Sequence, residues 1–242
     1  MSINPIFRRL SLVTGEEGLE KLSKTKVLIF GLGGVGSWAA EALVRSGVGK
    51  INIVDSDTIC ASNINRQIEA TALTIGQPKA EALKNRLLEI NSECEIISFN
   101  ELFRLENAHL FNIENADFVI DAIDTLTHKL DLIETVCNAG ITLFSSMGMA
   151  WKTDPSLIKS VSIWKTDGCS LARLVRHGLR KRGFSSDFTA VYSGEQNALE
   201  QFSREEETAE KKSAPARGSI VTVTASAGLL LASLVIQSVT GK

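Results

Sequence analysis

The stretch that decides the fold of this chain is Val27-Leu28-Ile29-Phe30-Gly31-Leu32-Gly33-Gly34-Val35-Gly36. It opens with a short apolar run, which is typical of a strand buried on both faces of a parallel sheet. The glycines that follow allow a sharp turn and bring bare N–H groups to the start of a helix expected over residues 37–45. Because the N-terminus of a helix carries partial positive charge, this turn suits phosphate groups.

The next expected strand, Ile51-Asn52-Ile53-Val54, ends on Asp55. An acidic side chain at the end of the second strand can accept hydrogen bonds from ribose hydroxyls. The unit of strand, glycine turn, helix and strand therefore predicts a nucleotide site. The alternative is a tight turn that binds no ligand.

Bulk composition favours one large α/β domain. The chain has 242 residues, 44% of them hydrophobic, and 28 acidic against 26 basic residues give a net charge of −2. That balance indicates no polyanion partner for the whole molecule, although a local basic patch could bind one. Cys60, Cys94, Cys137 and Cys169 form no Cys-x-x-Cys pair, so we expect neither disulfides nor a zinc ribbon. Because residues 1–9 also lack the apolar segment of a secretory signal, a cytoplasmic protein is expected.

Strands and helices alternate along the rest of the chain. This alternation predicts a Rossmann-like, doubly wound, mostly parallel α/β sheet, extended by antiparallel strands and covered by helices on both faces. A helix is expected over residues 79–90, and further strands over 95–99, 116–121, 141–146 and 160–164, the last antiparallel. We expect a single domain over 1–242, with an N-terminal helical arm (1–25), a Rossmann-like nucleotide-binding part (26–150) and a C-terminal extension (151–242).

The C-terminal extension contains three segments of different character. Residues 171–182 carry basic side chains and no acid, with apolar residues at helical spacing, which predicts a basic amphipathic helix. Such a helix can lie on a nucleic-acid backbone or an anionic membrane surface, or it can be a solvated face only. Residues 195–217 are polar and charge-rich, as expected of a mobile loop. Residues 219–241 are uncharged but interrupted by hydroxyl groups, so we expect a strand (220–223) and a buried helix (227–239) rather than stable membrane insertion.

Polar side chains follow the expected strands at the carboxyl edge of the sheet, where ligands bind in this fold class. Asn63 and Arg66 come soon after the second strand, and Lys79 begins a helix, where a cation opposes the helix dipole unless it faces an anion. A surface lysine is the alternative. Asp121 and Asp124 end a later strand, and carboxylates beside phosphate suit Mg²⁺. The alternative has Asp121 as a structural acceptor and Asp124 as a helix cap.

These groups favour ATP over other nucleotides. The glycine turn and Asp55 would suit NAD equally, but hydride transfer needs no clamp for a triphosphate. A carboxylate that attacks the α-phosphate of ATP does need one, because Arg66, Lys79 and Mg²⁺ can stabilise the charge of the departing pyrophosphate. The chain lacks Gly-x-x-x-x-Gly-Lys-Ser/Thr, which argues against a P-loop kinase. Adenylate formation is therefore the predicted chemistry.

The same motifs resemble a known superfamily. The residues that carry the resemblance are the glycine turn, Asp55-Ser56-Asp57, Ser62-Asn63-Ile64-Asn65-Arg66-Gln67, Gly76-Gln77-Pro78-Lys79 and Asp121-Ala122-Ile123-Asp124. They are similar to those of the adenylating superfamily of ubiquitin-activating enzymes and of thiamine and molybdopterin adenylyltransferases. Three further segments resemble the tRNA threonylcarbamoyladenosine dehydratases: residues 171–183, Val191-Tyr192-Ser193-Gly194-Glu195 and Gly218-Ser219-Ile220.

The resemblance implies roles for individual residues. The implied nucleotide contacts are Gly33, Gly34, Asp55, Asn63, Arg66, Lys79, Asp124 and Thr125, where Thr125 replaces the asparagine of the adenylyltransferases. The implied catalytic residues are Arg9, Arg66, Lys79 and Asp124, with Asp124 as the Mg²⁺ ligand. Arg9 would be lent across the two-fold axis of a homodimer to the partner's γ-phosphate. From its position near the chain terminus alone, Arg9 would be solvated surface.

The resemblance also implies an activity, an ATP-dependent dehydration. The threonyl carboxylate of threonylcarbamoyladenosine in tRNA would be adenylated with loss of pyrophosphate, and a nitrogen or oxygen of the same side chain would close a ring and release AMP. The side chains expected to contact tRNA are Arg173, Arg176, Arg180 and Lys181. A cysteine desulfurase or sulfur acceptor is a further expected partner. One alternative is adenylation of the C-terminus of a small ubiquitin-like sulfur-carrier protein; another is a module that binds ATP without turnover.

Overall fold

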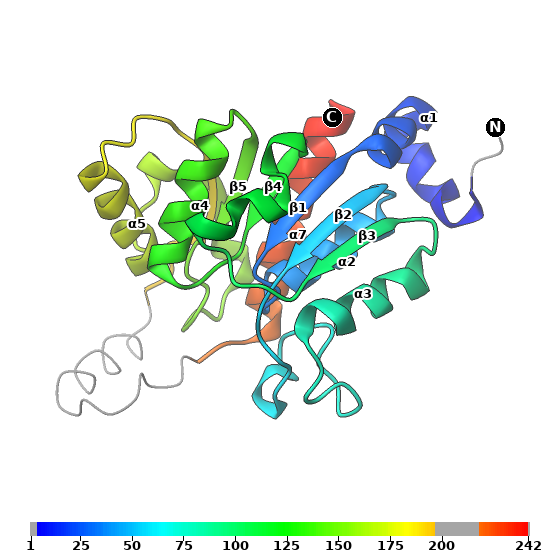
Figure 1. Ribbon diagram of the computed structural model, residues 1–242, viewed down its shortest axis with the longest axis horizontal. Helices are drawn as coiled ribbons and strands as arrows, with labels where there is room; N and C mark the ends of the chain where they lie inside the picture. Colours follow the sequence, from blue (N-terminus) through cyan, green and yellow to red (C-terminus); the bar gives the residue numbers. More distant parts are fainter. Residues whose placement is uncertain (1–3, 197–217, 242) are drawn as a thin grey trace.

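The computed structural model describes residues 4–196 and 218–241, and the described chain is built on one mixed sheet (Figure 1). The strand order is β3-β2-β1-β4-β5-β7-β6. All neighbouring strands run parallel except β6, which is antiparallel to β7. The strands are β1 (Lys26–Phe30), β2 (Lys50–Val54), β3 (Glu95–Phe99), β4 (Phe118–Asp121), β5 (Thr142–Ser146), β6 (Ile158–Ser162) and β7 (Thr189–Ser193). The predicted fold class is confirmed.

Helices cover both faces of this sheet (Figure 1). The α-helices are α1 (Arg8–Lys24), α2 (Gly36–Arg45), α3 (Lys79–Ile90), α4 (Leu126–Asn138), α5 (Ser170–Lys181) and α7 (Val221–Thr240). Short 3₁₀ helices are η1 (Pro5–Phe7), η2 (Ala61–Asn63), η3 (Leu105–Phe111), η4 (Ile113–Asn115), η5 (Pro155–Leu157) and η6 (Ile163–Lys165). The basic helix and the antiparallel strand expected from the sequence are present as α5 and β6.

The sheet separates two hydrophobic cores. In β1, Val27 and Ile29 pack with α2, α3 and α7, whereas Leu28 and Phe30 pack with α4 and α5 on the opposite face. Successive side chains of a strand point to opposite faces, so a strand covered on both sides must be apolar throughout. This explains the continuous apolar run before the glycine turn.

The C-terminal apolar segment differs from the prediction. Residues 220–223 do not form a strand, because α7 already begins at Val221. Their β-branched side chains favour a strand locally. The helix prevails because it aligns Val223, Ala227 and Leu231 in one buried stripe. Gly228 lets α7 approach α2 closely, since a Cβ there would lie 2.3 Å from the carbonyl oxygen of Val35.

Within the described residues, α7 is also the one helix long and apolar enough to cross a membrane, with a mean hydropathy of 1.7. It packs against α1, α2 and the strands β5, β6 and β7, as a core helix does. The expectation of no stable membrane insertion stays a prediction. Of the loop expected over 195–217, Glu195 accepts hydrogen bonds from the backbone of Thr153 and Asp154. Residues 197–217 lie outside the described chain.

Candidate nucleotide site

The glycine turn between β1 and α2 depends on missing side chains. Gly31 has a φ of +87°, a conformation that favours glycine. A Cβ at Gly36 would lie 1.9 Å from the carbonyl oxygen of Gly31. A Cβ at Gly34 would lie 3.0 Å from both the Cγ of Arg66 and the Oγ1 of Thr224. The turn is therefore closely packed, and side chains at Gly34 and Gly36 would not fit without a shift of their neighbours.

Gly36→Ala is expected to disrupt this turn. The added methyl group cannot fit 1.9 Å from Gly31 O, so the backbone must shift. We expect a loss of about 3 kcal/mol or more in the free energy of unfolding, measured by urea titration. The matched control is Gly148→Ala, whose Cβ would make ordinary contacts at 3.4 Å or more. Equal stability of the two variants would contradict this account of the turn.

Asp55 connects the turn to the end of β2. Its Oδ2 accepts a hydrogen bond from Leu32 N at 2.7 Å, and its Oδ1 accepts one from Asp57 N at 2.8 Å. Burial raises the pKa of the Asp55 carboxyl above its ordinary value, and the positive charge of Lys79 offsets part of this rise. Asp55 thus stands at the carboxyl edge of the sheet beside the glycine turn, as predicted from its position after the second strand.

Lys79 begins α3 and points toward the same edge. Its side chain is buried, and Nζ lies 2.8 Å from Oδ2 of Asp57. Burial alone would lower the pKa of Lys79, but the negative charges of Asp55 and Asp57 outweigh it and raise the pKa above its ordinary value. The ammonium group therefore stays charged. A buried cation at a helix N-terminus, held by carboxylates, is not the surface lysine of the alternative reading.

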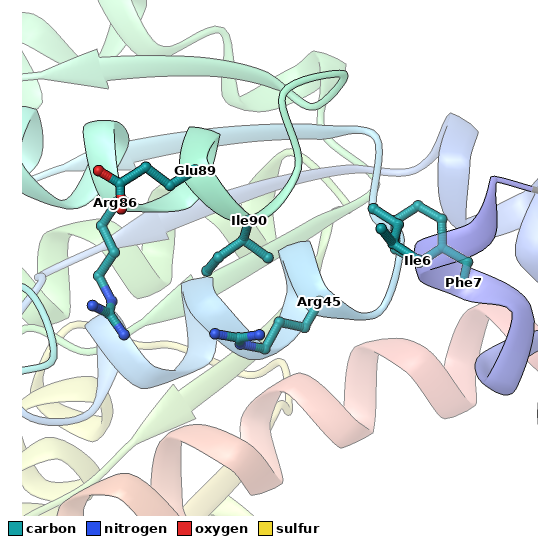
Figure 2. A pocket seen from close by; sticks show the side chains of 6 residues that line it. All are labelled: Ile6, Phe7, Arg45, Arg86, Glu89 and Ile90. Atoms are coloured by element: carbon teal, nitrogen blue, oxygen red, sulfur yellow. The ribbon is translucent and has the colours of Figure 1, made fainter.

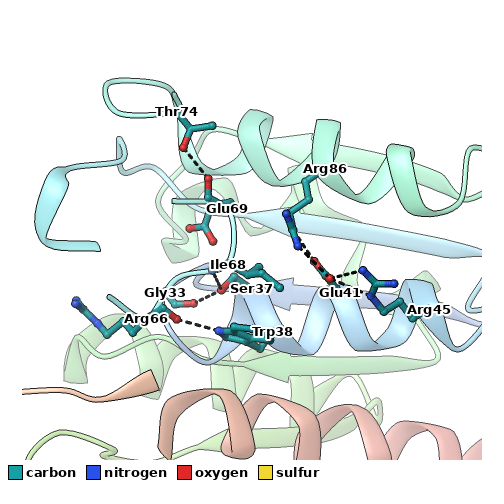
Figure 3. A network of polar contacts seen from close by, with 10 residues as sticks. All are labelled: Gly33, Ser37, Trp38, Glu41, Arg45, Arg66, Ile68, Glu69, Thr74 and Arg86. Carbon is teal, nitrogen blue, oxygen red and sulfur yellow. Dashed lines mark hydrogen bonds and ion pairs between the residues drawn. The ribbon is translucent and has the colours of Figure 1, made fainter. Parts of the chain in front are cut away.

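Arg66 and Asn63 lie in the segment after β2, which packs against the glycine turn through Arg66. The Arg66 backbone oxygen accepts a hydrogen bond from Trp38 Nε1 at 2.9 Å (Figure 3). Its guanidinium Nη1 donates to Ser62 O and to Asn65 Oδ1, both at 2.8 Å. Asn63 is buried, and its Oδ1 accepts from Cys60 N. The aliphatic part of the Arg66 side chain thus lies against Gly34. The side-chain oxygen of Asn63 stabilises the 3₁₀ turn in which Asn63 itself lies.

The end of β4 contains a buried ion pair. Lys129 Nζ lies 2.7 Å from Asp121 Oδ2, and both side chains are fully buried. The same ammonium donates to Ile123 O at 2.8 Å, and Ser145 Oγ donates to Asp121 Oδ2 at 2.6 Å. Asp121 is therefore a structural acceptor, one of the two readings left open by the sequence. These bonds fix the backbone up to Ile123, directly before Asp124.

Asp124 and Thr125 are exposed at this edge. Thr125 Oγ1 donates to Asp124 Oδ1 at 3.4 Å. No side-chain cap bond is present at the start of α4, so Asp124 does not act as the helix cap of the alternative reading. Among the described residues, no cluster of three or more His, Cys, Asp or Glu side chains could hold a metal ion. A single exposed carboxylate still fits Mg²⁺, which takes one or two carboxylates and completes its shell with water and phosphate.

Arg9 is not close to these residues within one chain. It is exposed near the start of α1, and α1 packs beside the C-terminal end of α7, where Gly18 meets Thr240 (Figure 1). The glycine turn packs beside the other end of α7, at Thr224. The 1.5 Å rise per residue places these two ends of α7 roughly 24 Å apart.

The basic helix α5 lies on the other face of the sheet. Arg173, Arg180 and Lys181 are exposed, but the Arg180 guanidinium stands 5.4 Å from the centre of the Trp164 ring. Arg176 is half-buried and donates a hydrogen bond to Thr166 Oγ1. Two of the four predicted tRNA contacts, Arg176 and Arg180, therefore also hold the local structure.

Sequence reasoning gave no role to several residues of the site. They are Ser37, Asp57, Glu69, Lys129 and Thr224. Ser37 Oγ donates to Gly33 O at 2.7 Å and so closes the glycine turn. Asp57 follows β2 within the segment Asp55-Ser56-Asp57, and this position is the sequence signal for its place at the site. Lys129 and Thr224 reach the site by packing of distant segments, which no local pattern reveals.

A separate hollow of about 440 Å³ lies at the opposite end of α2 (Figure 2). It is lined by Ile6, Phe7, Arg45, Arg86, Glu89 and Ile90. Both arginines are already paired with the buried carboxylate of Glu41. This hollow is therefore distinct from the edge that carries the glycine turn.

Comparison with known proteins agrees with this geometry. The tRNA threonylcarbamoyladenosine dehydratase of Bacillus subtilis is 43% identical over 189 residues, which are 78% of this chain and 74% of that protein. The enzyme of the same name from Haemophilus influenzae is 34% identical over 236 residues, 93% of this chain and 90% of the relative.

A solved structure extends the likeness to the whole chain. The Escherichia coli tRNA N6-threonylcarbamoyladenosine dehydratase in complex with ATP superposes with a TM-score of 0.88 at 28% identity. The superposition covers 100% of this chain and 98% of that one. A sequence model of the ThiF family matches residues 7–242. The protein therefore belongs to the ThiF family.

Proposed function

We propose that this chain is an ATP-dependent tRNA threonylcarbamoyladenosine dehydratase. The observation that carries the proposal is the meeting of the glycine turn, Asp55 and the buried ammonium of Lys79 at one edge of the sheet. The likeness to dehydratases over most of the chain, including one bound to ATP, supports both the nucleotide and the substrate. The reaction converts threonylcarbamoyladenosine in tRNA to its cyclic form.

The proposed reaction has two steps. The threonyl carboxylate oxygen bonds to the α-phosphorus of ATP while the bond to pyrophosphate breaks. A nitrogen or oxygen of the same side chain then bonds to the activated carbonyl carbon and loses its proton to solvent, while the bond from that carbon to AMP breaks. Backbone N–H groups near Gly33 and Gly34 would hold the phosphates, and Asn63 would contact them. Asp55 would hold the ribose. Lys79 and Arg66 would neutralise the charge of the departing pyrophosphate.

Mg²⁺ is part of the proposal. Asp124 would hold it from the end of β4, with Thr125 beside it, because the carboxylate is exposed and its backbone is fixed by the Asp121–Lys129 pair. When bound, Mg²⁺ would offset the negative charge of the phosphates. Asp124→Asn is the variant that tests this ligand, by the Mg²⁺ concentration needed for half-maximal AMP formation.

A homodimer and a cytoplasmic location complete the proposal. Within one chain, Arg9 lies near the far end of α7 from the glycine turn, so a role for it at the γ-phosphate requires a second copy. Exposed Ile6, Leu12 and Val13 near Arg9 support an interface there. A cysteine desulfurase or sulfur acceptor is the proposed further partner, and the scattered free cysteines fit a reducing compartment.

The proposed tRNA surface is the exposed face of α5. The double variant Arg173→Glu/Lys181→Glu avoids the side chains that hold Thr166 and Trp164. We expect weaker tRNA binding, with ATP binding unchanged. The negative slope of log affinity against log salt is expected to become smaller in magnitude by about 2. The control reverses two exposed lysines of α1, Lys21 and Lys24, and is expected to leave the slope unchanged.

The same variant distinguishes the two adenylation substrates. A small ubiquitin-like carrier protein would be adenylated equally well after charge reversal on α5, and tRNA would not. The proposed function itself is tested by incubating the purified protein with ATP, Mg²⁺ and tRNA that bears threonylcarbamoyladenosine. AMP and a nucleoside lighter by one water molecule are expected. Absence of both products, with ATP bound, would contradict it.

A further inference from the structure

Glu69 is a buried acid to which the proposed reaction gives no role. Its side chain is 2% exposed, and neither carboxylate oxygen has a hydrogen-bond partner within the described residues. Only its backbone oxygen is bonded, by Thr74 Oγ1 at 2.7 Å (Figure 3). An unpaired carboxylate in such a place carries a large desolvation cost. The structure therefore keeps at the site a group whose ionised form is poorly stabilised.

The charged neighbours of Glu69 are those of the nucleotide site. Ser37, at the start of α2, lies beside the Glu69 carboxyl but donates its hydroxyl to Gly33 O (Figure 3). Lys79, on α3, attracts the carboxylate, and Asp55, at the end of β2, repels it. Asp57 competes for the same ammonium, since it holds Lys79 Nζ at 2.8 Å. Glu69 is thus coupled both to the glycine turn and to the lysine proposed to contact phosphate.

The balance of these effects moves the titration of Glu69 into the neutral range. Burial raises the pKa of Glu69 to about 7, and the charge of Lys79 limits the rise. Near pH 7, a change in the charge around Glu69 therefore changes the fraction of Glu69 that holds a proton.

We propose that Glu69 is a positioning residue of the nucleotide site, which takes up a proton from solvent when ATP binds. The inference rests on the proposed binding of ATP at this edge. The triphosphate brings negative charge close to the Glu69 carboxylate and engages the positive charge of Lys79 that had stabilised it. Both changes favour the neutral acid. A neutral Glu69 then no longer competes with the phosphates for the charge of Lys79.

The sign of the pH dependence follows from proton linkage. At pH values well below 7, Glu69 already holds its proton, and ATP binding requires no uptake. As the pH rises above 7, each ATP bound must also bind a proton, so affinity falls by up to about tenfold per pH unit. The maximum affinity is therefore expected on the acid side of neutrality.

The test is calorimetric titration of the full chain with ATP and Mg²⁺ at pH 7 and pH 8, in two buffers of different ionisation enthalpy. The difference in observed heat gives the number of protons taken up. Glu69→Gln removes the titrating group and keeps its shape, and Glu114→Gln, at an exposed position on η4, is the matched control. Because nucleotide protons cancel between variants, the comparison isolates Glu69.

We expect wild type and Glu114→Gln to take up about half a proton more than Glu69→Gln at pH 7, and more at pH 8. A purely structural role would change affinity but not this count. Equal counts in wild type and Glu69→Gln would overturn the inference while leaving ATP binding intact. Absence of ATP binding would overturn it together with the proposed function. If Glu69→Gln does not fold, Glu69→Met serves as the second variant without a titrating group.

Discussion

Lys79→Met is expected to reduce AMP formation by about 10² to 10³-fold in kcat, the usual cost of removing one stabiliser of transition-state charge. Lys79 is the buried cation that meets Asp57 and Asp55 at the sheet edge. Methionine keeps the buried stem but supplies no positive charge to the leaving pyrophosphate. The measurement is AMP release with modified tRNA under saturating ATP.

The matched control is Lys84→Met, on the same helix. Lys84 lies more than one turn farther along α3 than Lys79, away from the helix N-terminus at the sheet edge. We expect the turnover of Lys84→Met to stay within about twofold of wild type. Melting temperatures of both variants separate loss of catalysis from loss of fold. Wild-type turnover in Lys79→Met would contradict the proposed phosphate role.

Lys129→Met is expected to lower the free energy of unfolding by about 3–5 kcal/mol, because it leaves a buried charge without its partner. That charge is the carboxylate of Asp121, which lies 2.7 Å from Lys129 Nζ and is fully buried. Urea unfolding measures the loss. We also expect weaker binding of Mg²⁺ by Asp124. The backbone before Asp124 loses the hydrogen bond that Lys129 donates to Ile123 O.

Two controls define this effect. The double variant Lys129→Met/Asp121→Asn removes both charges and is expected to recover most of the lost stability. Lys24→Met breaks an exposed pair with Glu20, whose side chains are 73% and 66% exposed, and is expected to cost less than about 1 kcal/mol. A similar loss in Lys24→Met and Lys129→Met would show that burial of the pair does not matter.

The parts of the fold that local sequence determines were predicted correctly. The apolar run before Gly31 and the glycines are contiguous, and Asp55 directly follows the next strand, so each has a local physical reason for its conformation. The basic helix α5 was predicted for the same reason, since its charge and apolar spacing lie within one segment. Lys79 was placed at a helix start by the proline that precedes it.

Other parts depend on contacts between distant segments. The strand predicted over 220–223 is wrong because packing of α7 on α2 outweighs the local preference of β-branched residues. The Asp121–Lys129 pair needs a strand end and a helix to be placed together before it can be seen. Glu69 stands between Ile68 and Ala70 in a segment without a clear helix or strand pattern, where only the folded chain reveals its burial.

A crystal structure with Mg²⁺ and a non-hydrolysable ATP analogue tests the central claim most directly. The account predicts phosphates against the backbone of Gly33 and Gly34, with Lys79 and Arg66 in contact with them. It also predicts the ribose on Asp55 and the metal on Asp124. A nucleotide bound elsewhere, or Lys79 still paired with Asp57 and turned away from the phosphates, would contradict it.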